Sequence, residues 1–220
     1  MRRLHRLTTT MSVLLLAACA GGMGMGGGST SNMSFFVTSA NPGKGADFGG
    51  LAGADQYCQT LASAAGAGGK TWRAYLSATG PTPVNARDRI GRGPWYNAKG
   101  TMIASNVDEL HGTNQLSKAT ALTEKGEGVM GAGDAVNMHD VLTGSTPDGR
   151  ATAGGTADTT CGNWTKGGDG SAIVGHHDRT GLDESAPAKS WNSSHASRGC
   201  SLASLKATGG DGRLYCFAAN

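Results

Sequence analysis

The last third of the chain, residues 161–217, most constrains the fold that this sequence can adopt. It contains three of the five cysteines and two of the four tryptophans. Most of its other residues are Gly, Ser, Asp and Thr, which cannot bury enough apolar surface to offset the entropy of ordering an irregular chain. We therefore expect covalent cross-links, or a sheet formed elsewhere in the chain, to stabilise this region.

The N-terminus has the order of an export signal. Three arginines precede the apolar residues 13–16, and two alanines stand directly before Cys19. The apolar run is much shorter than the roughly 20 residues that a helix needs to cross a bilayer. The segment 16–19, Leu-Ala-Ala-Cys, resembles the lipobox of bacterial lipoproteins, which implies that residues 1–18 are a lipoprotein signal peptide and that Cys19 is lipidated. The alternative is an ordinary secretory signal that contains a cysteine.

The segment after the signal is rich in glycine and shows no periodicity. Such a composition is typical of a flexible tether. We interpret residues 19–34 as the lipidated cysteine and a tether, followed by a folded domain over residues 35–220. The lipid anchor implies a location in the cell envelope, with the outer membrane as the expected membrane partner.

The positive charge of the chain belongs to the signal. Residues 1–18 hold three of the 19 Lys and Arg residues and none of the 16 Asp and Glu residues, so the rest carries 16 charges of each sign. No basic run with interleaved aromatic residues follows. Nucleic acid is therefore not an expected partner.

Four cysteines remain after Cys19, at positions 58, 161, 200 and 216. An even number in an exported chain favours two disulfides. The spacings lack the short Cys-x-x-Cys pairs of zinc ribbons and redox sites, which favours structural bridges over metal or redox chemistry. The spacings leave all three pairings open.

The apolar pattern predicts an α+β domain with one good helix. Leu51–Ala65 has apolar residues at helical spacing, with Cys58 on the buried face and Gly66 in the position of a C-terminal cap. Short strands are predicted at 34–39, 71–77, 101–104, 141–143 and 213–217, and short turns or helices at 86–90 and 107–111. The last strand is expected to pair with the first, and the long stretch 112–160 to be mostly irregular.

The ordered motifs of the chain resemble the endostatin-like domain of bacterial lipoproteins. They are Phe36-Val37-Thr38-Ser39, the segment 49–55 with Cys58, residues 86–90, Leu142-Thr143-Gly144, residues 161–165, Trp191, Cys200 and residues 213–217. The resemblance implies a C-type-lectin-like fold with small antiparallel sheets, one main helix and a long irregular loop region. It also implies nested disulfides, Cys58 with Cys216 and Cys161 with Cys200.

The resemblance implies a binding function, because some members of the family bind host matrix and serum proteins. An extracellular protein or a glycan is therefore the expected partner. Sugar-binding lectins of this fold hold calcium with Glu-Pro-Asn or Gln-Pro-Asp and with Trp-Asn-Asp, and none of these tripeptides occurs in the chain. Asn163, Trp164 and Trp191 are candidate ligand-binding residues, although tryptophans beside disulfides more often belong to the core.

His176, His177 and Asp178 are the most metal-like group, with His139, Asp140, His195 and His111 as candidate partners. Neighbouring residues on a strand point to opposite faces, so His176 and His177 can bind one ion only from a bent loop. The endostatin of collagens binds zinc through N-terminal histidines that have no counterpart at these positions. Solvated loop histidines are therefore the expectation, and no cofactor is predicted.

No phosphate loop, Gly-x-Ser-x-Gly elbow, His-Glu-x-x-His or dinucleotide fingerprint occurs in the chain. The sequence thus favours a non-enzymatic binding or adhesion module facing the periplasm or the exterior. One alternative is a structural lipoprotein of the cell envelope. The other is a metal-dependent hydrolase that uses His176, His177 and Asp178.

Overall fold

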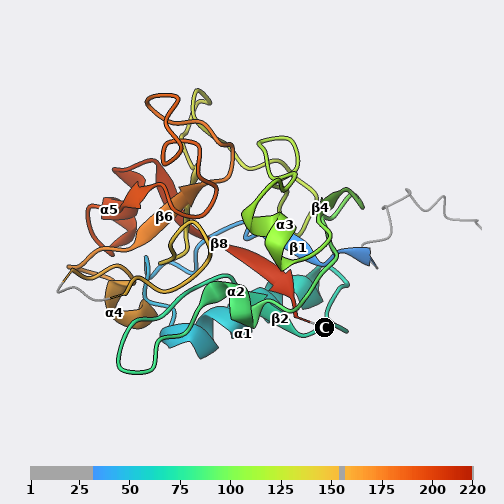
Figure 1. Cartoon of the computed structure of the whole chain (residues 1–220), viewed down its shortest axis with the longest axis horizontal. Coiled ribbons are helices and arrows are strands. Elements are labelled where there is room, and N and C mark those ends of the chain that lie inside the picture. Colours follow the sequence, from blue (N-terminus) through green and yellow to red (C-terminus); the bar gives the residue numbers. More distant parts are fainter. Residues whose placement is uncertain (1–31, 154–156, 220) are drawn as a thin grey trace, which may run out of the picture.

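The last strand, β8 (Gly210–Ala218), lies at the centre of the fold in the computed structural model, which describes residues 32–153 and 157–219 (Figure 1). A six-stranded sheet contains β8 with β1 (Phe35–Val37), β2 (Trp72–Ala74), β5 (Asp140–Leu142), β6 (Ile173–His176) and β7 (His195–Ala196). A separate hairpin pairs β3 (Trp95–Tyr96) with β4 (Met102–Ala104). The helices are α1 (Gly50–Ala64), α2 (Ala86–Arg89), α3 (Val107–His111), α4 (Cys161–Trp164) and α5 (Leu202–Lys206). The predicted α+β class is confirmed.

Both ends of the described chain meet in this sheet. Strand β1 pairs antiparallel with β8, with Phe35 opposite Phe217 and Val37 opposite Tyr215. This confirms the predicted pairing of the first and last strands. Strand β2 pairs with the other edge of β8, again antiparallel.

The sheet is mixed, so the expectation of small antiparallel sheets is wrong for its centre. Strand β5 runs parallel to β8, with Leu142 opposite Leu214. A parallel pair needs a long connection between its strands. Here the stretch 143–209 is that connection. It contains β6, which pairs antiparallel with β5, and β7, which pairs antiparallel with β6. Short isolated strand signals in the sequence do not reveal this crossover.

Strand β8 is buried on both faces and separates two cores. Leu214, Cys216 and Ala218 face the core beneath α1, while Tyr215 and Phe217 face the core closed by the β3–β4 hairpin and α3. Neighbouring residues of a strand point to opposite faces. The predicted alternation of the second strand follows the same rule, since Trp72, Ala74 and Leu76 lie in the first core and Tyr75 in the second.

Helix α1 begins and ends within one residue of the predicted bounds. Its buried face consists of Ala54, Asp55, Cys58 and Ala62. Gly66 has φ 78°, and its N–H donates to the Ser63 carbonyl, so it has the left-handed conformation expected after a helix end.

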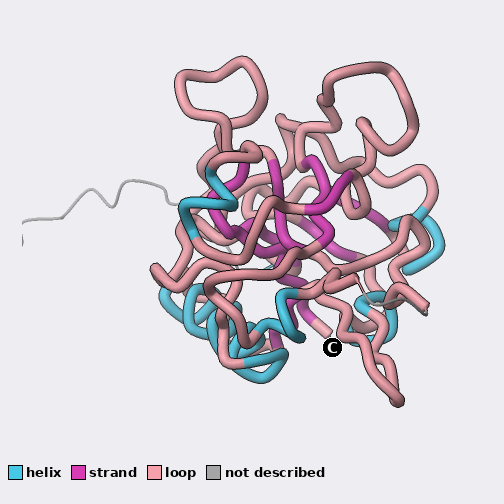
Figure 2. Tube along the Cα trace, turned by 90° about the vertical axis from the view of Figure 1, so that its left-hand side faces the viewer, coloured by secondary structure: helices cyan, strands magenta, loops and turns pink. Residues whose placement is uncertain are grey.

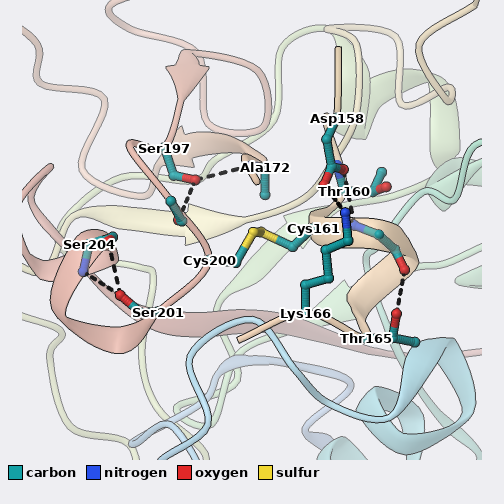
Figure 3. Close-up of a disulfide and its surroundings, with 12 residues drawn as sticks. Asp158, Thr160, Cys161, Thr165, Lys166, Ala172, Ser197, Cys200, Ser201 and Ser204 are labelled. Atoms are coloured by element: carbon teal, nitrogen blue, oxygen red, sulfur yellow. Dashed lines mark hydrogen bonds and ion pairs between the residues drawn. A yellow bond between two sulfur atoms is a disulfide. The ribbon is translucent and has the colours of Figure 1, made fainter. Parts of the chain in front are cut away.

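Two disulfides link the elements in the nested order that the resemblance implies. Cys58 of α1 is bonded to Cys216 of β8, and Cys161 is bonded to Cys200 (Figure 3). Beside the second bridge, the Asp158 carboxylate accepts hydrogen bonds from the N–H groups of Thr160 and Gly162. The bridge and these bonds hold the turn of α4 against the segment before α5.

Loops form most of the described chain and surround the strands, with the helices toward the outside (Figure 2). In the last third, β6, β7, α4 and α5 differ from the sequence-based expectation, which places no element there before residue 213. Across residues 32–153 and 157–219, no helix is both long and apolar enough to cross a membrane. The predicted signal, the lipidation site Cys19 and the tether up to residue 31 lie outside the described residues.

Gly175 allows the segment after β6 to approach the sheet closely. A Cβ atom at this position would lie 1.9 Å from the Trp191 carbonyl oxygen, which accepts a hydrogen bond from the Tyr215 hydroxyl at 2.9 Å. Gly175→Ala is therefore expected to lower the free energy of unfolding by about 1–3 kcal/mol or more, since backbone must move. Urea unfolding measures the loss, and Gly128→Ala is the control, because a Cβ atom there meets nothing within 4 Å.

Candidate metal centre

The register of the sheet brings Asp140, His176 and His195 to one face. Asp140 of β5 stands opposite His176 of β6, and Val174 of β6 stands opposite His195 of β7. Val174 and His176 are two residues apart and so share a face, and directly paired residues also share a face. The three polar side chains continue the face that Leu142 and Val174 present to the first core. His139, immediately before β5, completes the group.

Three imidazoles converge on one carboxylate oxygen. The distances to Asp140 Oδ1 are 3.3 Å from His139 Nε2, 3.2 Å from His176 Nε2 and 3.4 Å from His195 Nε2. The rings of His139 and His176 stack, with their centroids 4.0 Å apart and their planes 11° from parallel. Both Nε2 atoms lie within 3.3 Å of the same Asp140 oxygen. We call His139, Asp140, His176 and His195 the His/Asp cluster.

The other nitrogen of each ring faces an oxygen outside the cluster. His176 Nδ1 is 2.7 Å from the Ala188 carbonyl, His195 Nδ1 is 3.1 Å from the Ala196 carbonyl, and His139 Nδ1 is 3.4 Å from Asp178 Oδ1. The carbonyl partners place the ring protons of His176 and His195 on Nδ1 and leave their Nε2 lone pairs for a metal ion. His139 Nδ1 lies near Asp178 but makes no hydrogen bond within the described part of the chain. Asp178 is itself held by the N–H groups of Ala132 and Thr180.

Three side chains of the cluster are buried, and several of their polar atoms lack hydrogen bonds. The side chains of His139, Asp140 and His176 are 9%, 2% and 5% exposed. Within the described part of the chain, both Asp140 carboxylate oxygens and His176 Nε2 have no hydrogen-bond partner. The nitrogens are close to Oδ1 but not aligned for bonding. Buried polar atoms without partners are costly, so atoms that converge on one point need an explanation such as an ion.

The electrostatics of the cluster favour a negatively charged Asp140. Burial acts to raise the pKa of Asp140, but the nearby nitrogens of His176 and His195 outweigh burial and hold the pKa below its ordinary value. Contact with Asp140 in turn raises the pKa of His195, against the effect of burial. Burial acts to raise the pKa of Asp178 as well, and the His139 and backbone contacts hold it well below its ordinary value.

This arrangement fits a divalent transition metal. Three imidazole nitrogens and one carboxylate oxygen are ligands that zinc accepts, with bonds of about 2.0–2.2 Å. Tetrahedral bonds of that length place the ligand atoms roughly 3.3–3.6 Å apart. The three distances from Asp140 Oδ1 agree with this spacing. The ligand atoms of His139, Asp140 and His176 all lie within 4.8 Å of one another, whereas His195 stands outside that mutual group and is close to Asp140 Oδ1. A calcium or magnesium ion would instead require mainly oxygen ligands.

A pocket of about 370 Å³ opens beside the cluster. Three of its lining residues are the cluster histidines, and the rest are Ala132, Asn137, Gly181, Leu182, Asp183, Ala188, Ser194 and Thr208. Gly209, with φ 100°, adjoins two of the lining residues, because a Cβ atom there would lie 2.8 Å from Asn137 Nδ2 and 3.1 Å from His139 Nε2. The side of the cluster away from Asp140 thus faces a space that solvent can enter.

The structure places only one of the three most metal-like residues at the centre. His176 belongs to the His/Asp cluster, whereas His177 points to the other side of the sheet, 3.2 Å from the Met130 carbonyl. Burial lowers the pKa of His177. Asp178 lies behind His139, and His111 lies elsewhere, 2.8 Å from the Tyr75 hydroxyl. Of the candidate partners, His139, Asp140 and His195 join the centre.

The three candidate ligand-binding residues are buried or hydrogen-bonded within the fold. Trp164 is fully buried and Trp191 is 3% exposed, so neither presents a face to a ligand. The Asn163 amide accepts a hydrogen bond from the Thr79 N–H at 2.8 Å and donates to the Thr79 carbonyl. These residues stabilise loops and core. Asn137 and Gly209 at the pocket were not among the predicted site residues, and no motif marks them.

Comparison of the chain with models of protein families and with curated proteins gives no match.

Proposed function

We propose that this chain is an exported, non-enzymatic binding module that holds a divalent transition metal, zinc first, in the His/Asp cluster. The observation that carries the proposal is the convergence of three imidazole Nε2 atoms on Asp140 Oδ1, at 3.2–3.4 Å. Buried, unpartnered carboxylate oxygens at the same point support it. A bound ion would join β5, β6 and β7 and satisfy these atoms together.

The surroundings of the cluster support binding rather than hydrolysis. A metal-dependent hydrolase needs a general base within hydrogen-bond reach of the attacking water. Among the described residues that line the pocket, the one carboxylate is Asp183, which accepts a hydrogen bond from the Ser185 N–H in an exposed loop turn. The hydrolase alternative also relied on His177, which points away from the centre.

The proposed fold is the endostatin-like variant of the C-type-lectin-like fold. Three features support it: the pairing of β1 with β8, the 15-residue helix α1 and the nested disulfides. The proposed location is the cell envelope, with the domain anchored through a lipid on Cys19, by resemblance of residues 16–19 to a lipobox. An extracellular protein or a glycan remains the proposed partner.

Zinc titration of the full chain tests the proposal. Protein purified in detergent without chelator, then stripped of metal, is expected to bind one zinc ion per chain by calorimetry. His176→Ala should weaken zinc binding by about a hundredfold or more, since loss of an outer partner alone costs 10–100-fold. Asp178→Asn should weaken it by about tenfold through His139.

The matched control is His111→Gln, which removes a half-buried histidine outside the cluster. Its zinc affinity should equal that of the parent chain. Circular dichroism and thermal unfolding establish that each variant is folded. A parent chain that binds no zinc, cobalt, manganese, iron or copper, or a folded His176→Ala variant with unchanged affinity, would refute the metal centre.

A further inference from the structure

The His/Asp cluster is closed on one side and open on the other. Asp140 is 2% exposed and is not part of the pocket wall, so it approaches the shared point from the protein interior. His139, His176 and His195 all line the pocket, and the His195 side chain is 38% exposed. The pocket side of an ion held by these four residues is the side from which a fifth ligand could approach, expanding the four-coordinate set to five.

The space on the open side is bordered by a second donor. Asn137 Oδ1 accepts a hydrogen bond from the His139 N–H at 3.2 Å, so the Asn137 amide nitrogen is the atom left for a ligand. A Cβ atom at Gly209 would lie 2.8 Å from Asn137 Nδ2 and 3.1 Å from His139 Nε2. The amide nitrogen and a metal-binding nitrogen thus flank the same small space, which the glycine keeps empty.

The two groups that flank this space favour a ligand that offers oxygen lone pairs and donates no hydrogen bond. A metal ion and an amide N–H both require an oxygen lone pair, and a carboxylate offers two oxygens that can serve them at once. The cluster contributes one negative charge, from Asp140, against the two positive charges of the ion. Asp183 is the one carboxylate among the described lining residues, and its oxygen accepts a hydrogen bond from the Ser185 N–H. Ala132, Gly181, Leu182 and Ala188 form an uncharged part of the wall.

We propose that the centre keeps a coordination position open to the pocket and binds there the carboxylate group of an exogenous ligand, with Asn137 donating to its second oxygen. This inference rests on the proposed metal-binding function. The volume of about 370 Å³ suits a ligand of one or two residues or a small organic acid. The shared chemistry is the carboxylate, whether it belongs to a free acid or to the C-terminus of a peptide.

Cobalt-loaded full chain provides the test, because the visible absorption of cobalt reports its coordination shell. Acetate is expected to change the spectrum saturably, and acetamide, which has the same shape without the charge, is expected to leave it unchanged. A short peptide with a free C-terminus and the same peptide amidated form a second pair. Saturation by acetate alone would assign the pocket to small acids, and tighter binding of the free peptide would assign it to chain ends.

The Asn137→Asp variant removes the amide donor without changing any of the proposed metal ligands. The substituted side chain keeps the oxygen that accepts from the His139 N–H but replaces the donor with a negative charge. Cobalt should still bind one per chain, whereas acetate affinity should fall by at least about tenfold, the loss expected for a hydrogen bond to a charged group. Thr208→Val is the control from the same pocket, because the Thr208 hydroxyl already donates to the Leu205 carbonyl. Its acetate affinity should be unchanged.

The outcomes distinguish this inference from the function on which it rests. Failure of the chain to bind cobalt or zinc at all would refute the metal centre itself. Binding of cobalt with a spectrum that acetate does not change, up to about 0.1 M, would show a closed four-ligand site, since millimolar affinity would be near saturation there. Equal acetate affinity in the parent chain and a folded, cobalt-loaded Asn137→Asp variant would remove Asn137 from the site.

Discussion

Replacing Cys58 and Cys216 together with alanine is expected to destabilise the domain more than loss of the other disulfide does. The bridge closes a loop of 158 residues and joins helix α1 to the central strand β8. In the chain-entropy model its removal costs about 5 kcal/mol of unfolding free energy, and strain or residual structure in the unfolded chain reduces the figure. For a domain of this size each kcal/mol corresponds to about 2–4 °C in Tm.

The matched control is the double replacement of Cys161 and Cys200, whose bridge spans 39 residues. Its nominal cost is smaller, about 4 kcal/mol. Hydrogen exchange should locate the two effects differently: loss of the first bridge should weaken protection throughout the sheet, and loss of the second mainly in residues 157–200. A parent-like Tm for the Cys58→Ala/Cys216→Ala chain would contradict the view that this bridge holds α1 on β8.

Asp55→Ala is expected to cost about 3–5 kcal/mol, because it leaves a buried guanidinium without its partner. Both Asp55 oxygens accept from Arg89 Nη2, at 2.8 and 2.6 Å, and Asp55 Oδ1 also accepts from the Ala74 N–H at 2.9 Å. The Arg89 and Asp55 side chains are only 12% and 10% exposed. This carboxylate ties α1 to both β2 and α2.

Asp108→Ala is the control for removal of a surface charge. Asp108 pairs with Arg87 at 3.1 Å, but its side chain is 94% exposed, so the pair should contribute about 1 kcal/mol or less. Urea denaturation of both variants gives the comparison. If Asp55→Ala and Asp108→Ala lose equal amounts of unfolding free energy, the buried Asp55–Arg89 pair does not stabilise the domain as described.

The parts of the fold with regular apolar spacing could be predicted from the sequence. Helix α1 and strands β1, β2 and β8 have apolar residues at the spacing of a helix or a strand. The structure places α1 within one residue of its predicted bounds, whereas β2 ends three residues before its predicted end and β8 begins three residues before its predicted start. Strand β6 could not be predicted, because Ile173-Val174-Gly175-His176 includes a glycine and a histidine where a strand pattern needs apolar residues. Its stability comes from pairing with β5 and β7, which is not a local property.

The candidate site could be predicted only as a set of residue types. The sequence groups His176 with His177 and Asp178 because they are adjacent, although adjacent residues of a strand diverge. The structure groups His176 with Asp140 and His195 because they share a face across three strands. That register depends on the parallel pairing of β5 with β8 and on the crossover between them. No motif in the sequence encodes these long-range relations.

An anomalous difference map from crystals of the zinc-loaded chain, measured at the zinc absorption edge, tests the metal centre most directly. One peak is predicted, about 2.0–2.2 Å from the Nε2 atoms of His139, His176 and His195 and from an Asp140 carboxylate oxygen. Its open side should face the pocket lined by Leu182 and Ser194. A peak at His111 or His177, or no peak in crystals grown with excess zinc, would contradict the proposed centre.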